Sequence, residues 1–276
     1  MARPTRAAYF FANGAGEQQS ARSRTWGDSV NQECFSLWSE SALGRPNFLC
    51  IGQPHAGEDW LSDILAGHRE VRLPRDNGCY FSYNYHRGER WYLERFDGGG
   101  ARRVGEIGPM YLYGDLAASR IAAFRSIRKL VVLLRDPRSW LAARYAHIRQ
   151  SQRRARDRAY FLEHHAQEFD RLCVHSFLAL YLSLFDRNAF LFLTTDAVRT
   201  EEQAAAARLA DFLEIDSSGF ARPRRPARLL LPRLSRPPAP PDWLFEELRA
   251  RRALVNEQTE RLGEAVGRDL SGWRID

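Results

Sequence analysis

The chain has 276 residues, of which 44% are hydrophobic and 27% are charged. This length corresponds to one large domain or two small ones, and the hydrophobic fraction excludes wholly disordered and fibrous proteins. Basic residues exceed acidic ones by 41 − 34 = 7, and nearly all are arginine, which is typical of a GC-rich bacterial genome. Because Lys129 is the one lysine, a phosphate site must use arginine, histidine or backbone N–H groups.

The spacing of the cysteines, histidines and apolar residues argues against three further classes of protein, namely disulfide-rich, metal-binding and membrane-spanning proteins. The four cysteines lie far apart without a CxxC pair, which disfavours a disulfide scaffold or a zinc ribbon and favours a reducing cytoplasm. His164, His165 and His175 lack further ligands at metal spacing, so we expect no metal site. Continuous apolar runs such as Leu130–Leu134 have the length of a strand and are too short to cross a bilayer.

Residues 1–45 are predicted to form an N-terminal extension. They are rich in Gly, Ser, Ala and Arg and have no sustained hydrophobic period. The apolar stretch at residues 9–12 is too short for the core of a secretory signal. We expect a loose arm or a partner-binding segment, followed by a single domain over residues 46–276.

The domain is predicted to begin with a strand, a glycine-rich turn and a helix. Residues 48–51 form a short continuous apolar run, as in a buried parallel strand. The turn at residues 52–57 follows, and residues 58–65 then have apolar positions at helical spacing.

Later segments repeat the alternation of strand and helix. Apolar runs predict further strands near 104–107, 129–135 and 189–193. Helices are expected near 115–126, 138–150, 200–214 and 242–266, with one or two more in 160–186, and a Pro/Arg-rich loop over 221–241. Alternation of this kind predicts an α/β fold with a mostly parallel central sheet flanked by helices.

The turn after the first strand has the spacing of a phosphate-binding loop. Gly52 and Gly57 stand five residues apart, between a strand and a helix, as in G-x-x-x-x-G. Such a loop directs backbone N–H groups and a helix N-terminus at an anion. The next residues are Glu58 and Asp59 rather than Lys and Ser or Thr, which disfavours hydrolysis of ATP or GTP by the usual route.

Five segments in order resemble the sulfotransferases that use 3′-phosphoadenosine 5′-phosphosulfate (PAPS). The family's loop reads roughly G-x-x-K-[AS]-G-T-[TS]-x-L, and its second signature is a strand ending R-[DN]-P before a helix. The resemblance covers about residues 46–275. It is carried by Gly52–Leu61, by the pair Tyr80-Phe81, by Gly105–Tyr111 (G-E-I-G-P-M-Y), by Leu133–Pro137 with Ala143-Arg144-Tyr145, and by Leu262-Gly263 with Gly267–Trp273.

The resemblance implies a fold related to nucleotide kinases and a metal-free reaction. A sulfuryl group would pass from PAPS to a hydroxyl of a small molecule or natural product. In the family, the loop and the strand-terminal arginine bind the donor, and a basic loop late in the chain closes over its 3′-phosphate. The positions here that match are Gly52, Gln53, Ala56, Gly57 and Arg135, with Arg222, Arg224 and Arg225 as candidates in the late loop.

The departures from the family fall at positions that carry its chemistry. His55 replaces the loop lysine, and Glu58 and Asp59 replace the two loop hydroxyls. Each carboxylate, about 4 Å from a phosphate at an effective dielectric near 20, would oppose binding by about 4 kcal/mol per unit charge. Three further replacements are Asp76-Asn77 for a Lys-Glu pair, Ala143 for the serine that binds the 3′-phosphate, and Gly108 for the serine of G-E-x-S-P.

Three hypotheses therefore stand side by side. The first is sulfuryl transfer from PAPS. The second is a repurposed enzyme that performs PAPS-independent acid/base chemistry (cyclisation, elimination or hydrolysis) on a natural-product intermediate. The third is a non-catalytic binding protein. The candidate catalytic residues are His55, Glu58, Asp59, Asp76 and Glu106.

Each candidate also has a purely structural interpretation. Glu58 and Asp59 suit a helix N-terminus, Asp76 opens a good turn sequence, and Arg135 or Glu106 could serve a structural ion pair or hydrogen bond. Tyr80, Phe81 and Tyr111 are expected to line an acceptor pocket, with core packing as the alternative.

Two arginine runs, 149–158 and 221–236, predict a basic surface. Such a surface could bind an acidic partner, for example an acyl carrier protein. Nucleic acid is disfavoured because no aromatic residues for base stacking alternate with these arginines.

Overall fold

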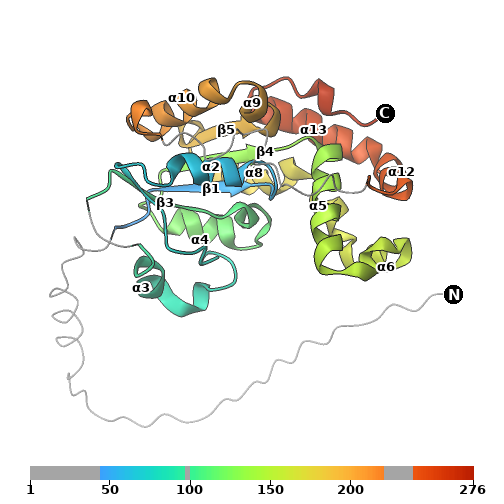
Figure 1. Cartoon of the computed structure of the whole chain (residues 1–276), viewed down its shortest axis with the longest axis horizontal. Helices are drawn as coiled ribbons and strands as arrows, with labels where there is room; N and C mark the ends of the chain where they lie inside the picture. The colour runs from blue at the N-terminus through green and yellow to red at the C-terminus, as the bar shows by residue number, and fades with distance from the viewer. Residues whose placement is uncertain (1–43, 97–99, 221–238) are drawn as a thin grey trace, which may run out of the picture. The chain divides into compact units, whose positions relative to one another are not determined.

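A computed structural model describes residues 44–96, 100–220 and 239–276. Five parallel strands form one sheet in the order β2-β3-β1-β4-β5 (Figure 1). The predicted α/β fold with a parallel sheet is confirmed. The strands are β1 (Phe48–Gly52), β2 (Val71–Arg72), β3 (Arg103–Ile107), β4 (Lys129–Leu134) and β5 (Phe190–Thr194).

The helices lie close to their predicted positions but are more divided. Residues 158–184 hold three helices, and the segment predicted as a single helix near 242–266 holds two, whereas the helix predicted near 200–214 is a single helix over Glu202–Leu213. The helices are α2 (Glu58–Leu65), α3 (Gly88–Leu93), α4 (Ala117–Ala123), α5 (Pro137–Ser151), α6 (Arg158–His165), α7 (Gln167–Asp170), α8 (Val174–Leu184), α9 (Thr195–Thr200), α10 (Glu202–Leu213), α12 (Asp242–Ala250) and α13 (Arg252–Val266).

Helices cover both faces of the sheet. Because side chains alternate along a strand, Leu49 and Val132 pack with α4, α8 and part of α13, whereas Cys50 and Leu133 pack with α2, α9 and α10. A third apolar cluster joins α5, α6 and α12, which lie beyond the carboxyl end of β4 at the right of Figure 1. The carboxyl edge of the sheet therefore lies next to a group of helices that pack in an apolar cluster of their own.

Gly52 allows β1 and β4 to run close together. A Cβ atom at this position would lie 2.2 Å from the carbonyl oxygen of Leu133, and the backbone φ of 134° is one that side chains rarely adopt. The close approach sets Gln53 beside the end of β4, where the Arg135 N–H donates to Gln53 Oε1 at 2.8 Å. The two segments that carry the family motifs therefore meet at one edge of the sheet.

Several predicted features fall outside the described residues. They are residues 1–43 of the predicted extension and most of the predicted loop 221–241, including Arg222, Arg224 and Arg225. Within the described ranges, no helix combines the length and the apolarity needed to cross a membrane.

Candidate functional site

Three elements hold the loop between β1 and α2 by its carbonyl groups. Trp140 Nε1 donates to Pro54 O at 2.8 Å, and Thr195 Oγ1 donates to Ala56 O at 2.9 Å. Between them, Arg135 Nη1 donates to His55 O at 2.6 Å. His55 itself has a positive φ of 64°, a left-handed conformation that is uncommon outside glycine. The loop shape is therefore fixed by side chains from α5, α9 and the end of β4.

The Glu58 carboxylate occupies the N–H side of this loop. Glu58 Oε1 accepts from the His55 N–H at 2.6 Å, and Oε2 accepts from the Gly57 N–H at 3.1 Å. A phosphate-binding loop offers these same kinds of donor to its ligand. The loop therefore holds an anion already, supplied by its own helix, whereas the neighbouring Asp59 is exposed.

His55 lies near His147, Arg144 and Arg135. Its ring centroid is 4.9 Å from that of His147, and its Nε2 atom is buried without a hydrogen-bond partner. Burial first, and then His147, Arg144 and Arg135, lower the pKa of His55 to about 4. At neutral pH this residue is therefore an uncharged imidazole and does not supply the charge of the lysine that it replaces.

Arg135 lies where the end of β4 meets α5. Its Nε donates to Ser139 Oγ at 3.1 Å, and burial lowers the pKa of the guanidinium. Ala143, which stands where the family has a serine, lies four residues after Ser139 and so on the same side of α5. A hydroxyl is thus present on this helix face one turn earlier than the family pattern places it.

A buried carboxylate joins two more arginines near the loop. Glu168 is 1% exposed and accepts from Arg144 through both oxygens, at 2.8 and 3.0 Å, and from Arg171 at 2.6 Å. Arg171 also lies over the ring of Tyr113, with 5.5 Å between the guanidinium carbon and the ring centroid. Because two guanidinium groups share one carboxylate, the cluster keeps a net positive charge.

Glu106 lies inside the core at β3. It is fully buried, and both of its oxygens accept from the Tyr111 hydroxyl, at 3.0 and 2.9 Å. Burial raises the pKa of Glu106 to about 7, although the hydrogen bond from Tyr111 opposes that shift. Gly108 fits here because a Cβ atom would lie 2.4 Å from the Tyr111 ring.

The other predicted site residues divide between turn, core and pocket. Asp76 forms an ion pair with Arg95, and Asn77 closes a local turn by accepting from the Cys79 N–H at 3.0 Å. Tyr80 stacks on Tyr92 in the core, with ring centroids 4.5 Å apart. The structure places Tyr80, Phe81 and Tyr111 in the core, and Phe81 is also among the residues around a pocket.

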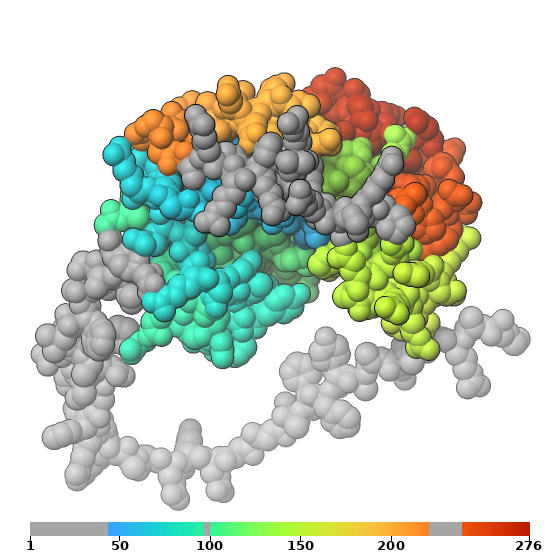
Figure 2. Space-filling view, in the orientation of Figure 1, coloured from blue at the N-terminus to red at the C-terminus, as the bar shows by residue number. Residues whose placement is uncertain are grey.

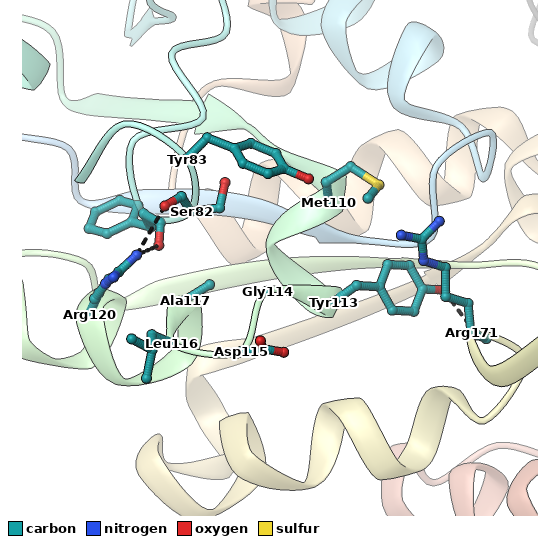
Figure 3. A pocket seen from close by; sticks show the side chains of 11 residues that line it. Ser82, Tyr83, Met110, Tyr113, Gly114, Asp115, Leu116, Ala117, Arg120 and Arg171 are labelled. Atoms are coloured by element: carbon teal, nitrogen blue, oxygen red, sulfur yellow. Dashed lines mark hydrogen bonds between the residues drawn. The ribbon is translucent and has the colours of Figure 1, made fainter. Parts of the chain in front are cut away.

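That pocket has a volume of about 310 Å³ and adjoins the loop through Tyr113 (Figure 3). The Tyr113 hydroxyl hydrogen-bonds the Gln53 side chain and donates to Arg171 O at 3.1 Å. Arg120 on the opposite side donates to the carbonyls of Phe81 and Ser82, both at 3.0 Å. The remaining lining residues are Tyr83, Met110, Gly114, Asp115, Leu116 and Ala117.

The arginine run 149–158 lies on the surface, in the yellow-green part of Figure 2. Arg158 pairs with Glu247 at 2.7 Å, while Arg149 and Arg154 lie over the rings of Tyr145 and Tyr160. Across the described ranges, no group of three or more His, Cys, Asp or Glu residues could hold a metal ion.

Sequence reasoning missed several side chains around His55. Arg171, Glu168 and His147 lie outside the family motifs, and only Arg144 stood within one. The signal that could have found Arg144 and His147 is their place on the helix that follows Arg135.

Known proteins resemble this chain in part of the sequence and in the fold. No family model matches it. The membrane-associated sulfotransferase kil1 of Dictyostelium discoideum is 30% identical over 100 residues, which are 34% of this chain and 21% of that protein. Mouse (Mus musculus) heparan sulfate glucosamine 3-O-sulfotransferase 3A1 is 29% identical over 102 residues, which are 37% and 26% of the two chains. The chain thus spans about a fifth to a quarter of the length of these relatives.

A solved structure matches over most of the fold. The sulfotransferase from Alicyclobacillus acidocaldarius superposes with a TM-score of 0.65 and 24% identity, over 84% of this chain and 99% of that one. The predicted resemblance to sulfotransferases is therefore confirmed, in sequence over about a third of the chain and in fold over most of the described residues.

Proposed function

We propose that this chain, whose fold is that of the sulfotransferases, binds PAPS at the loop 52–57 and transfers its sulfuryl group to a hydroxyl of a small molecule. The observation that carries the proposal is the pair of N–H groups on His55 and Gly57, which hold an anion in the structure. Loops that present N–H groups in this way bind phosphates.

The residues around the loop fit a phosphorylated ligand. The N–H groups of His55 and Gly57 would hold its 5′-phosphate, while Arg135 and Ser139 would serve the 3′-phosphate that the family binds with arginine and serine. PAPS supplies an activated sulfuryl group on a phosphate leaving group. Arg144 and Arg171, fixed by Glu168, keep the region positively charged and would stabilise the developing negative charge.

In this proposal, His55 would accept a proton from the acceptor hydroxyl. It is uncharged at neutral pH, and its buried Nε2 has no hydrogen-bond partner. A bound anion beside it would raise the pKa of the imidazole toward the range in which a general base works well. The pocket beside Tyr113 would hold the acceptor, with Met110 and Leu116 for an apolar portion.

Replacing Arg135 by glutamine should weaken binding of 3′-phosphoadenosine 5′-phosphate (PAP), the donor product, by roughly thirtyfold. The substitution removes a guanidinium that is charged and half-buried at the loop. Isothermal titration calorimetry measures the change. The matched control is Arg208→Gln on α10, since Arg208 is also partly buried and donates to a backbone carbonyl, Phe192 O, at 3.1 Å. Equal binding by the wild-type protein and both variants would contradict the assignment of Arg135.

Replacing His55 by asparagine should reduce turnover by roughly a hundredfold while PAP binding stays near the wild-type value. Asparagine tolerates the left-handed backbone of this position better than most residues, so the loop shape should persist. PAP release from PAPS in the presence of hydroxyl acceptors measures turnover. A variant that loses PAP binding and turnover together would assign His55 to binding instead.

A second candidate function is proton-transfer chemistry without PAPS. It is favoured by the uncharged imidazole of His55, whose buried Nε2 has no hydrogen-bond partner, since such a base needs no donor nucleotide. If the wild-type protein does not bind PAP even at millimolar concentration, this candidate takes precedence. If PAP binds but no acceptor turns over, a non-catalytic binding protein is the better description.

A further inference from the structure

The two peptide groups that hold Glu58 are fixed at their opposite ends. In a trans peptide, the C=O and the following N–H point in opposite directions. Trp140 holds the carbonyl of the Pro54–His55 peptide, and Thr195 holds the carbonyl of the Ala56–Gly57 peptide. The N–H groups of His55 and Gly57 are therefore aimed at one place by contacts that do not involve Glu58.

The role of Glu58 differs from ordinary helix capping. In a capping box, the glutamate stands at the third helical position and reaches back to the N-cap N–H. Glu58 is the first residue of α2, after the N-cap Gly57, and its two oxygens take one N–H each. This arrangement matches the way in which an oxyanion ligand would sit on the loop.

We infer that Glu58 is an internal anion that competes with the ligand phosphate for the N–H groups of His55 and Gly57. The inference rests on the proposed function, since it concerns the same loop. A phosphate must displace the carboxylate before it can bind these donors. Glu58 thus sets both the affinity of the loop and the class of ligand it admits, and a ligand without a strongly bound anionic group leaves the carboxylate in place.

Replacing Glu58 by alanine should tighten binding of inorganic pyrophosphate and of PAP by roughly tenfold or more, because the variant frees two N–H groups for a charged ligand. Glu58→Gln keeps one oxygen acceptor and should show an intermediate gain. The matched control is Asp63→Asn, which removes a negative charge from the same helix without a contact to the loop, and it should change affinity by less than about threefold. Calorimetric titration of the full chain measures all four proteins.

Binding of pyrophosphate tests the anion site of the loop alone, whereas binding of PAP also tests recognition of the nucleotide. A gain for pyrophosphate without PAP binding would support the internal anion and overturn the proposed function. Equal PAP binding by the wild-type protein and the Glu58 variants would support the proposed function and overturn the internal anion. No gain for either ligand in a Glu58→Ala protein that melts near the wild-type temperature would also overturn it. If the alanine variant does not fold, the glutamine variant decides by the same criteria.

Discussion

Replacing Glu168 by glutamine should lower the free energy of unfolding by about 3 to 5 kcal/mol. Glutamine has nearly the same shape, but it removes the negative charge that Arg144 and Arg171 share at 2.6–3.0 Å. Both arginine side chains are about four-fifths buried, so each would remain as a largely desolvated cation without its carboxylate. Equilibrium unfolding in denaturant measures the loss.

The matched control for this prediction is Glu163→Gln on α6. Its side chain is 77% exposed and lies 3.8 Å from His164, and exposed pairs contribute little. The control should stay within about 0.5 kcal/mol of the wild-type protein. If Glu168→Gln lowers the free energy of unfolding as little as the control does, this carboxylate does not organise Arg144 and Arg171. The proposal that these arginines stabilise developing charge would then be contradicted.

Replacing Glu106 by glutamine should remove a pH dependence worth about 3 kcal/mol from the free energy of unfolding. In the folded protein, burial raises the pKa of Glu106 from 4.5 to about 7. The folded state therefore binds this proton more tightly than the unfolded state does. The wild-type protein should lose this stability as the pH rises from about 4.5 through 7, because the buried carboxyl then ionises. Glutamine stays neutral and keeps an oxygen for the Tyr111 hydroxyl.

The test compares the free energies of unfolding of the two proteins at about pH 5 and pH 8. Taking the difference between the two proteins removes the contribution of His55, which titrates in both. The contribution of His55 to the pH dependence has the opposite sign to that of Glu106, because burial lowers the pKa of His55. Glu163→Gln again serves as the control and should follow the wild-type protein. A difference between wild type and Glu106→Gln that does not change with pH would show that Glu106 is ionised throughout this range.

The strands could be predicted because a parallel strand buried on both faces leaves a continuous apolar run. The runs that predicted β1, β4 and β5 are of this kind, and they were found within a residue or two. β2 has only two residues, Val71 and Arg72, which leave no pattern. The break between α12 and α13 at Arg251 has neither glycine nor proline to mark it, so the sequence predicted one helix there.

The loop could be located from its glycine spacing, but the state of its N–H groups could not be predicted. That state depends on a positive φ at His55 and on donors from Trp140 and Thr195, which lie far along the chain. The sequence suggested that Glu58 would repel a phosphate by its charge. The structure shows in addition that its carboxylate occupies the donors themselves.

The most direct test of the donor site is a crystal structure of the full chain grown with PAP. We expect the 5′-phosphate on the N–H groups of His55 and Gly57, with the Glu58 carboxylate turned away and Arg135 beside the nucleotide. A structure in which Glu58 still accepts from both N–H groups, while PAP is absent or bound elsewhere, would contradict a donor site at this loop.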